Sequence, residues 1–442
     1  MSRFAFPCFV ALLCLFLFAC GGGGGGSGGS TASRNNGSTD PTSPARGLAL
    51  SAVYLAGPLT APTRQPTYVK TLVADLNGDG RNDVVTFTNA TVNGSDVVVF
   101  YQDQRGQLSA FVSFNSMTDL GLMTVNDIAV ADMNGDGRAD LIVLGIALPV
   151  PTGIGYGPPI VVLQQDASGN LAAPIPISVV IGGLTLGQQD LGPRFAVGDL
   201  NGDGRNDIVV SGNPMTVLLQ GADGNVGTGL GSTFRVNGYA SMLGEVHIAD
   251  MNSDGRNDIV FQALQDRTIG VLRQTAPGVF ANAADLYPVT LGYFTTFNTF
   301  AVGDLNGDGK NDIAVPDPGN NGFINIFLQN SAGTLDPPHL VPMIAPYYGI
   351  TIADIDKDGL NDILGDIVVV DLPTSIGEVH VLRQNSDHSF QSPMIYTFQT
   401  AGGGGSPFCQ AMSVGDINND GWPDAVVAWM DEGIFAMLNV PH

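Results

Sequence analysis

The chain has 442 residues, of which 44% are hydrophobic and 13% are charged, and its formal net charge is −24 at pH 7. This length allows one large domain or two to three ordinary ones, with enough apolar side chains for a buried core. The charge excludes a nucleic-acid-binding protein that works through a basic surface. The 59 glycines and 27 prolines favour many turns over long helices.

The first twenty residues predict export. One positive charge, Arg3, precedes an apolar run from Phe4 to Ala19, which is too short to span a bilayer comfortably. The run ends in Leu-Phe-Ala-Cys, and this ending resembles the signal of bacterial lipoproteins. The resemblance implies that residues 1–20 are a lipoprotein signal peptide ending at the lipidated Cys20, and that Gly21 directs the chain to the outer membrane or cell surface. The alternative is ordinary secretion with cleavage at another position.

Residues 21–46 consist mainly of Gly, Ser, Thr and Asn, which is typical of a flexible coil. We therefore expect a tether between the lipid anchor and a folded domain over residues 47–442. No disulfide framework follows from the distribution of the cysteines, which are Cys8, Cys14, Cys20 and Cys409. Cys409 is the only cysteine in the predicted domain, and we expect it to be a structural thiol.

A nine-residue motif recurs along the predicted domain. The first copy, DLNGDGRND, starts at Asp75, and six further copies start after intervals of 57, 67, 51, 54, 50 and 62 residues. A period of this length marks an array of supersecondary units. Each copy lies between two short apolar runs, and a third run and a weaker fourth follow it. The repeated unit is therefore predicted to contain four strands and no long helix.

Seven four-stranded antiparallel units predict an all-β, seven-bladed β-propeller. An open solenoid is the alternative, but the two ends of the array argue against it. The last copy stops after its third strand, at residues 433–442, and a surplus apolar segment, residues 47–59, precedes the first copy. We expect this N-terminal strand to complete the last blade, which would close the ring and remove an open sheet edge.

The seven in-phase copies resemble the FG-GAP/VCBS repeats of bacterial surface proteins, whose blades are also those of the integrin α-subunit propeller. The resemblance extends over about residues 47–442. It implies the same propeller architecture and places the chain in this broad family.

Each copy carries the oxygen ligands that a hard cation such as Ca²⁺ prefers. Loop positions 1, 3 and 5 present side-chain oxygens on alternate residues, the glycine at position 6 permits a sharp turn, position 7 offers its backbone carbonyl, and the aspartate at position 9 closes the set. We expect up to seven Ca²⁺ ions, one per blade. The predicted ligand sets are Asp75, Asn77, Asp79, Arg81, Asp83; Asp132, Asn134, Asp136, Arg138, Asp140; Asp199, Asn201, Asp203, Arg205, Asp207; Asp250, Asn252, Asp254, Arg256, Asp258; Asp304, Asn306, Asp308, Lys310, Asp312; Asp354, Asp356, Asp358, Leu360, Asp362; and Asp416, Asn418, Asp420, Trp422, Asp424.

The sixth loop has an additional carboxylate, Asp356, and we expect it to bind Ca²⁺ most tightly if the geometry of all loops is equal. An EF-hand does not fit, because it needs a glutamate at position 12 and flanking helices, whereas position 12 is Thr86 or Val143 in the first two copies. Paired helical dockerin loops and nine-residue RTX rolls do not fit either.

The alternative without metal is a tight turn rich in Asp and Asn. Seven such clusters of carboxylates would repel one another without a cation, which favours the metal. Three aspartates in each loop together with Asp356 account for 22 of the 41 acidic residues, and seven Ca²⁺ ions would change the formal charge from −24 to −10.

No catalytic motif occurs in the sequence, so we predict a protein that is not an enzyme. Structural roles are favoured for Cys409 and for the histidines, which are His247, His339, His380, His388 and His442. The leading hypothesis is a calcium-stabilised binding or adhesion module at the cell surface. Its protein or glycan ligand would contact the longer interblade loops, 147–159, 182–193 and 399–410. The alternatives are a carbohydrate-active enzyme, a polysaccharide lyase or hydrolase, on the same scaffold, and a scaffolding role in an envelope complex.

Overall fold

The computed structural model describes residues 46–50, 68–88, 94–148, 159–177, 194–211, 215–222, 232–234, 243–263, 266–289, 300–317, 322–344, 347, 349–371, 374–399, 409–429 and 433–441. The chain divides into two compact units, Met1–Arg34 and Asn35–His442, and every described residue lies in the second. The predicted signal with Cys20, the tether before Arg46 and most of the three long loops lie outside the described residues.

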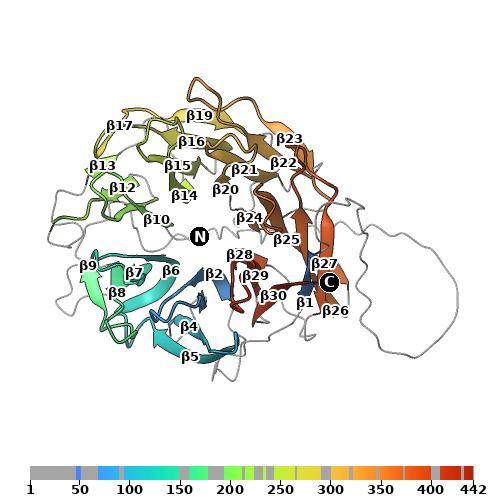
Figure 1. Cartoon of the computed structure of the whole chain (residues 1–442). Helices are drawn as coiled ribbons and strands as arrows, with labels where there is room; N and C mark the ends of the chain where they lie inside the picture. Colours follow the sequence, from blue (N-terminus) through green and yellow to red (C-terminus); the bar gives the residue numbers. More distant parts are fainter. Residues whose placement is uncertain are drawn as a thin grey trace, which may run out of the picture. The chain divides into compact units, whose positions relative to one another are not determined.

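The described chain folds into seven four-stranded antiparallel sheets, the blades of a β-propeller (Figure 1). The strands of blades 1 to 4 are β2 (Tyr68–Ala74), β3 (Asp83–Thr88), β4 (Asp96–Gln102) and β5 (Leu108–Asn115); β6 (Leu122–Ala131), β7 (Asp140–Ala147), β8 (Ile160–Leu163) and β9 (Ile175–Ile177); β10 (Phe195–Gly198), β11 (Asp207–Val210), β12 (Met215–Leu218) and β13 (Ser232–Phe234); and β14 (Leu243–Ala249), β15 (Asp258–Ala263), β16 (Thr268–Leu272) and β19 (Asp285–Pro288). Blade 4 also carries a hairpin of β17 (Gln274–Ala276) and β18 (Val279–Phe280), which the sequence did not predict.

Blades 5 to 7 continue the same order. Their strands are β20 (Ala301–Gly303), β21 (Asp312–Asp317), β22 (Phe323–Phe327) and β23 (His339–Pro342); β24 (Gly349–Ala353), β25 (Asp362–Asp371), β26 (Thr374–Leu382) and β27 (Met394–Gln399); and β28 (Cys409–Gly415), β29 (Asp424–Trp429) and β30 (Gly433–Pro441), with β1 (Arg46–Leu50) antiparallel to β30. The prediction of an all-β propeller with seven blades of four strands is thus confirmed. In the described part of the chain, no helix is long and apolar enough to cross a bilayer.

The second and third strands of each blade are buried on both faces, because each blade packs between two others. Side chains of β3 alternate between the two faces of the sheet. Val85 packs with Leu141 of blade 2, while Val84 packs with Val426 of blade 7. The continuous runs of β-branched residues that predicted these strands therefore reflect burial on both sides.

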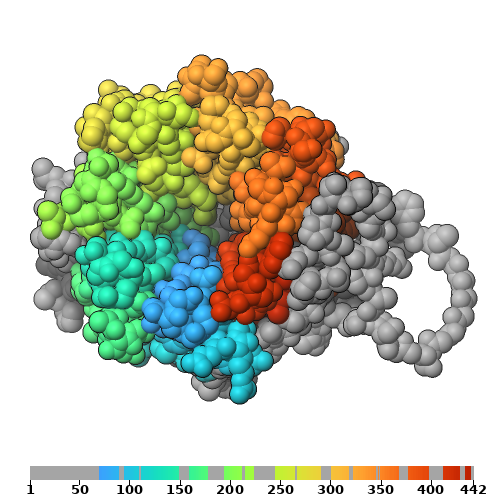
Figure 2. Space-filling model, viewed as in Figure 1, coloured from blue at the N-terminus to red at the C-terminus, as the bar shows by residue number. Residues whose placement is uncertain are grey.

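The buried apolar side chains of the described residues form seven clusters, each between two successive blades. One of these clusters joins the first blade to the last, where Phe100 and Leu108 of blade 1 pack with Ile434 of blade 7. Figure 2 shows the same arrangement on the surface, where the blue of blade 1 borders the red of blade 7.

Candidate functional site

The repeated motif forms the loop between the first and second strands of each blade, as predicted. The aspartate at position 9 is the first residue of the second strand in all seven blades, for example Asp83 at the start of β3. Gly80 at position 6 has a φ of 80°, which explains the glycine there. Position 4 also lies in the left-handed region, with φ of 71° at Gly78 and 57° at Lys357. The sequence analysis did not recognise this second turn position.

The aspartate at position 1 is the centre of each loop. In the first loop, Oδ1 of Asp75 accepts the N–H of Gly78 at 2.6 Å, and Oδ2 accepts the N–H of Gly80 at 2.8 Å. The second of these bonds recurs in all seven loops. Burial raises the pKa of Asp132 and Asp199, but the backbone N–H donors around each carboxylate outweigh it and hold the pKa below its usual range.

The aspartate at position 9 joins the loop to the third strand of its own blade. In the first loop, Oδ2 of Asp83 accepts the N–H of Leu76 and Oδ1 accepts the N–H of Gln102, both at 2.9 Å. Both bonds recur in every blade, and each of these seven aspartates is fully buried. Burial is the main cause that raises the pKa of this carboxyl, to about 6 at Asp83, about 7 at Asp424 and about 8 at Asp362.

The residue at position 7 has a role that the sequence analysis missed. Its backbone was predicted to offer a carbonyl, but in five loops its cationic side chain also forms an ion pair with the aspartate at position 5. The Arg81 guanidinium contacts Asp79 in this way, and its Nε donates to the carbonyl of Gln102 at 3.3 Å. The signal was available, since Arg or Lys occupies this position in five of the seven copies.

The sixth loop differs from the other six. Carboxylate oxygens of Asp354, Asp356 and Asp362 lie within 4.8 Å of one another, and no other such acidic cluster of metal-ligating type occurs among the described residues. Oδ1 of Asp356 is buried and accepts no hydrogen bond of good geometry. Because position 7 is Leu360, the loop has no cation of its own at that position.

A divalent cation fits this donor set. The hydrogen bonds within the loops make a self-contained turn, so the turn alone does not require a metal. Among the described residues, ion pairs reach five of the seven position 5 aspartates and Asp356, but none of the position 9 aspartates. The buried position 9 carboxylates therefore have no ion-pair partner, and a buried charge is costly without one. The side-chain oxygens at positions 1, 3, 5 and 9 and the carbonyl of position 7 are ligands that suit Ca²⁺.

Two kinds of amide side chain connect the loops to the preceding blade, and neither was recognised from the sequence. The asparagine at position 8 donates to the carbonyl of the position 1 aspartate in the preceding blade's loop in five cases. One of these bonds, from Asn82 to the carbonyl of Asp416 at 3.0 Å, joins blade 1 to blade 7. The glutamine after the third strand makes a similar connection, as from Gln384 to the carbonyl of Leu305 at 2.6 Å.

The histidines of the described part of the chain do not gather into a site. His380 is fully buried, with Nδ1 3.2 Å from the Tyr347 hydroxyl and Nε2 3.0 Å from Glu378. Burial lowers the pKa of His380 and of His247 below the usual range of histidine. The two residues lie on different strands of different blades, β26 and β14. Cys409 begins β28, and its side chain lies outside the described residues.

Comparisons with known proteins agree with this architecture. The family model of the FG-GAP-like repeat matches residues 75–143, 199–261, 250–315, 304–365 and 364–427. Integrin alpha-8 of Gallus gallus is 30% identical over 146 residues, which make up 29% of this chain and 13% of that protein. Integrin alpha-IIb of Mus musculus is 29% identical over 202 residues, or 39% of this chain and 20% of that protein. The chain thus matches only a small part of these integrin chains.

Among solved structures, BBS1N in complex with ARL6DN is similar in fold. In the mercury-soaked crystal it has a TM-score of 0.50 and 11% identity, covering 86% of this chain and 94% of that one. In the lead-soaked crystal the TM-score is 0.51 with 10% identity, covering 85% and 92%. At this identity the likeness supports the propeller fold alone.

Proposed function

Because the chain belongs to the FG-GAP-like repeat family, we propose that it is a calcium-stabilised propeller that acts as a binding or adhesion module at the bacterial cell surface. The observation that carries the calcium proposal is the set of seven fully buried position 9 aspartates. Each would contribute to one Ca²⁺ site with positions 1, 3 and 5 and the carbonyl of position 7, giving up to seven ions.

Bound calcium would supply the missing positive charge and hold the loop and the strands together. The chain's own residues already fix the donor positions, because the backbone N–H groups of each loop orient the carboxylates at positions 1 and 9. The ions would therefore stabilise blades that are also linked to one another by amide side chains, such as those of Asn82 and Gln384, which donate to backbone carbonyls of the preceding blade.

We further propose that the N-terminal strand closes the ring. The antiparallel pairing of β1 with β30 supports this, since it gives blade 7 a fourth strand and covers the edge of β30. The preceding residues 21–45 would then tether the propeller to a lipid on Cys20. The ligand would be a protein or a glycan that contacts the longer interblade loops, and the integrin relatives support a binding role over catalysis.

The experiment that tests the calcium proposal is a thermal melt of the full chain with saturating Ca²⁺ and with excess chelator. A ligand that binds only the folded state raises its stability by mass action, so we expect chelation to lower the melting temperature steeply. An unchanged melt in chelator would refute the proposal. Screening on glycan and protein arrays tests the binding role, and turnover of a polysaccharide would instead favour an enzyme.

A further inference from the structure

We infer that Arg383 is a built-in counter-cation of the sixth loop and lowers the affinity of that loop for Ca²⁺. The inference rests on the proposed calcium role and concerns one residue outside the nine-residue motif. Nη1 of Arg383 lies 3.3 Å from Oδ2 of Asp356, and the two side chains are only 16% and 8% exposed.

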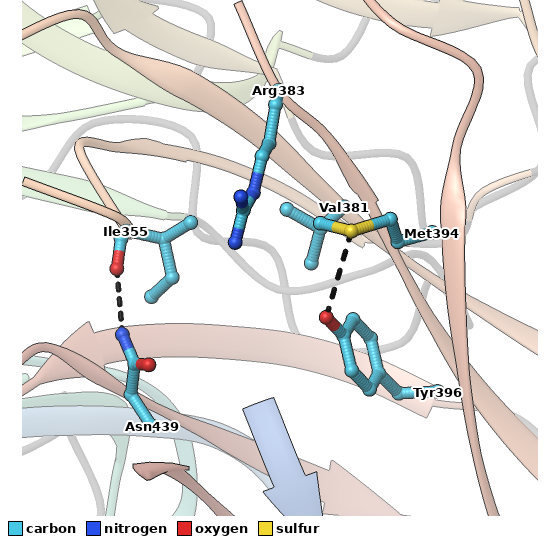
Figure 3. Close-up of a pocket in the computed structure, with 6 residues that line it drawn as sticks. All are labelled: Ile355, Val381, Arg383, Met394, Tyr396 and Asn439. Atoms are coloured by element: carbon cyan, nitrogen blue, oxygen red, sulfur yellow. Dashed lines mark hydrogen bonds between the residues drawn. The ribbon is translucent and has the colours of Figure 1, made fainter. Parts of the chain in front are cut away.

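The position of Arg383 is fixed by the fold. It follows the end of β26 and precedes Gln384, whose backbone N–H donates to Oδ1 of Asp362 at 2.8 Å. The same hydrogen bond that brings the third strand to the loop therefore places Arg383 beside it. Figure 3 shows its side chain reaching down between Ile355 on one side and Val381 on the other, in a small hollow between blades 6 and 7.

Within the described ranges, none of the corresponding residues in the other blades forms an ion pair with a loop carboxylate, although the charge of Arg273 acts at longer range on Asp258 of loop four. The corresponding residues are Tyr101, Gln164, Leu219, Arg273, Leu328 and Leu438. Arg273 is the only other cation at this position, and its Nε pairs with Asp285 of β19 at 2.5 Å. Position 3 of its loop is Asn252, so loop four lacks the carboxylate that Arg383 contacts.

Two opposite effects follow for loop six. One carboxylate oxygen of Asp356 lies within 4.8 Å of oxygens of Asp354 and Asp362, and its Oδ1 is buried without a hydrogen bond. Arg383 offsets that charge. The prediction that loop six binds Ca²⁺ most tightly assumed that all loops have equal geometry, and Arg383 makes loop six different from the others. Without metal the guanidinium would reduce repulsion among the three carboxylates, and with metal it would repel the ion. A unit charge about 5 Å from a divalent ion changes its affinity by on the order of tenfold even at the dielectric constant of water.

The test is a titration of the full chain with Ca²⁺ in competition with a chelating indicator, for wild type and for Arg383→Met, Arg383→Lys and Arg273→Met. We expect Arg383→Met to take up one ion at a free Ca²⁺ concentration about tenfold lower. Arg383→Lys keeps the charge and should bind like wild type. Arg273→Met removes the same type of residue at the same position of another blade, but its cation is paired with Asp285, so its curve should shift less than that of Arg383→Met. Arg383→Gln, of similar polarity, replaces Arg383→Met if the methionine variant does not fold.

A second measurement is the melting temperature. Arg383→Met should melt lower than wild type in excess chelator and at the wild-type temperature in saturating Ca²⁺. The inference is overturned if Arg383→Met or Arg383→Gln binds Ca²⁺ with unchanged or lower affinity, or if Arg273→Met tightens binding equally. These results are distinct from failure of the proposed function, in which wild type itself would take up no Ca²⁺ and melt identically in chelator.

Discussion

The substitution Gln384→Leu tests the connection between successive blades. Gln384 is 2% exposed, and its Nε2 donates to the carbonyl of Leu305 in blade 5 at 2.6 Å and to that of Asn361 at 3.2 Å. Leucine has a similar volume but leaves both carbonyls buried without this donor. An unsatisfied buried polar group costs roughly 1–3 kcal/mol, so we expect a loss of about 2–3 kcal/mol.

The matched control is Gln102→Leu in blade 1. Gln102 occupies the same position and is also 2% exposed, but neither its Nε2 nor its Oε1 has a hydrogen-bond partner. Replacing it removes a buried unpaired amide and should be neutral or stabilising. For a unit of roughly 400 residues, the expected loss in Gln384→Leu corresponds to a melting temperature lower by about 2–4 °C. Differential scanning fluorimetry in saturating Ca²⁺ measures both variants, and equal shifts would refute the interblade role of this glutamine.

Three further predictions use other parts of the molecule. Gly106 and Gly121 both have positive φ, of 73° and 71°, but a Cβ on Gly106 would lie 2.2 Å from the carbonyl of Asn418 in blade 7, whereas one on Gly121 meets nothing within 4 Å. Gly106→Ala should therefore melt lower than Gly121→Ala, and equal melts would argue against this contact. Cys20→Ala should release the chain from the membrane fraction, as followed by immunoblot, and continued retention would count against the lipid anchor. In excess chelator the melting temperature should fall from pH 6.5 to pH 9, because the folded-state pKa values of about 7 at Asp424 and about 8 at Asp362 exceed the ordinary aspartate pKa of 3.8. The folded chain then loses, as the pH rises, protons that the unfolded chain has already released; a rising melting temperature would contradict this sign.

The blades could be predicted from the sequence because three independent patterns agree within each repeat. The motif period counts the blades, the apolar runs count the strands, and the Asp-rich loop marks the junction of the first two strands. Each pattern depends on residues that are close in sequence, so it can be recognised without knowledge of the tertiary contacts. The β17–β18 hairpin was missed because it adds only two short strands inside the connection between the third and fourth strands of blade 4.

The carboxylates of the candidate site were predictable, but their surroundings were not. Asp83 was assigned as a ligand from its spacing, yet its burial and its bond to Gln102 depend on how the third strand docks. Arg383 lies outside the repeated motif, and its contact with Asp356 depends on how the third strand docks beside the loop, whereas Arg273 at the same position pairs with Asp285. The amides at position 8 recur in five copies and would have been found if the repeats had been compared column by column.

The hydrogen bonds between successive blades predict how loss of metal from one loop would affect the neighbouring blade. The position 9 aspartate of each blade holds the backbone of the residue after the third strand, and in blades 2 to 7 the side chain of that residue donates to the loop of the preceding blade. A loop that loosens therefore releases a contact of its neighbour as well as its own strand. Blade 1 is the exception, because Gln102 makes no such bond and Asn82 alone links its loop to Asp416. The junction of blades 1 and 7 has other polar links that do not involve the loops. The Thr71 hydroxyl donates to the carbonyl of Val426 at 3.2 Å and accepts from the Ser413 hydroxyl at 3.0 Å, so loosening of one loop leaves these bonds between the two blades in place.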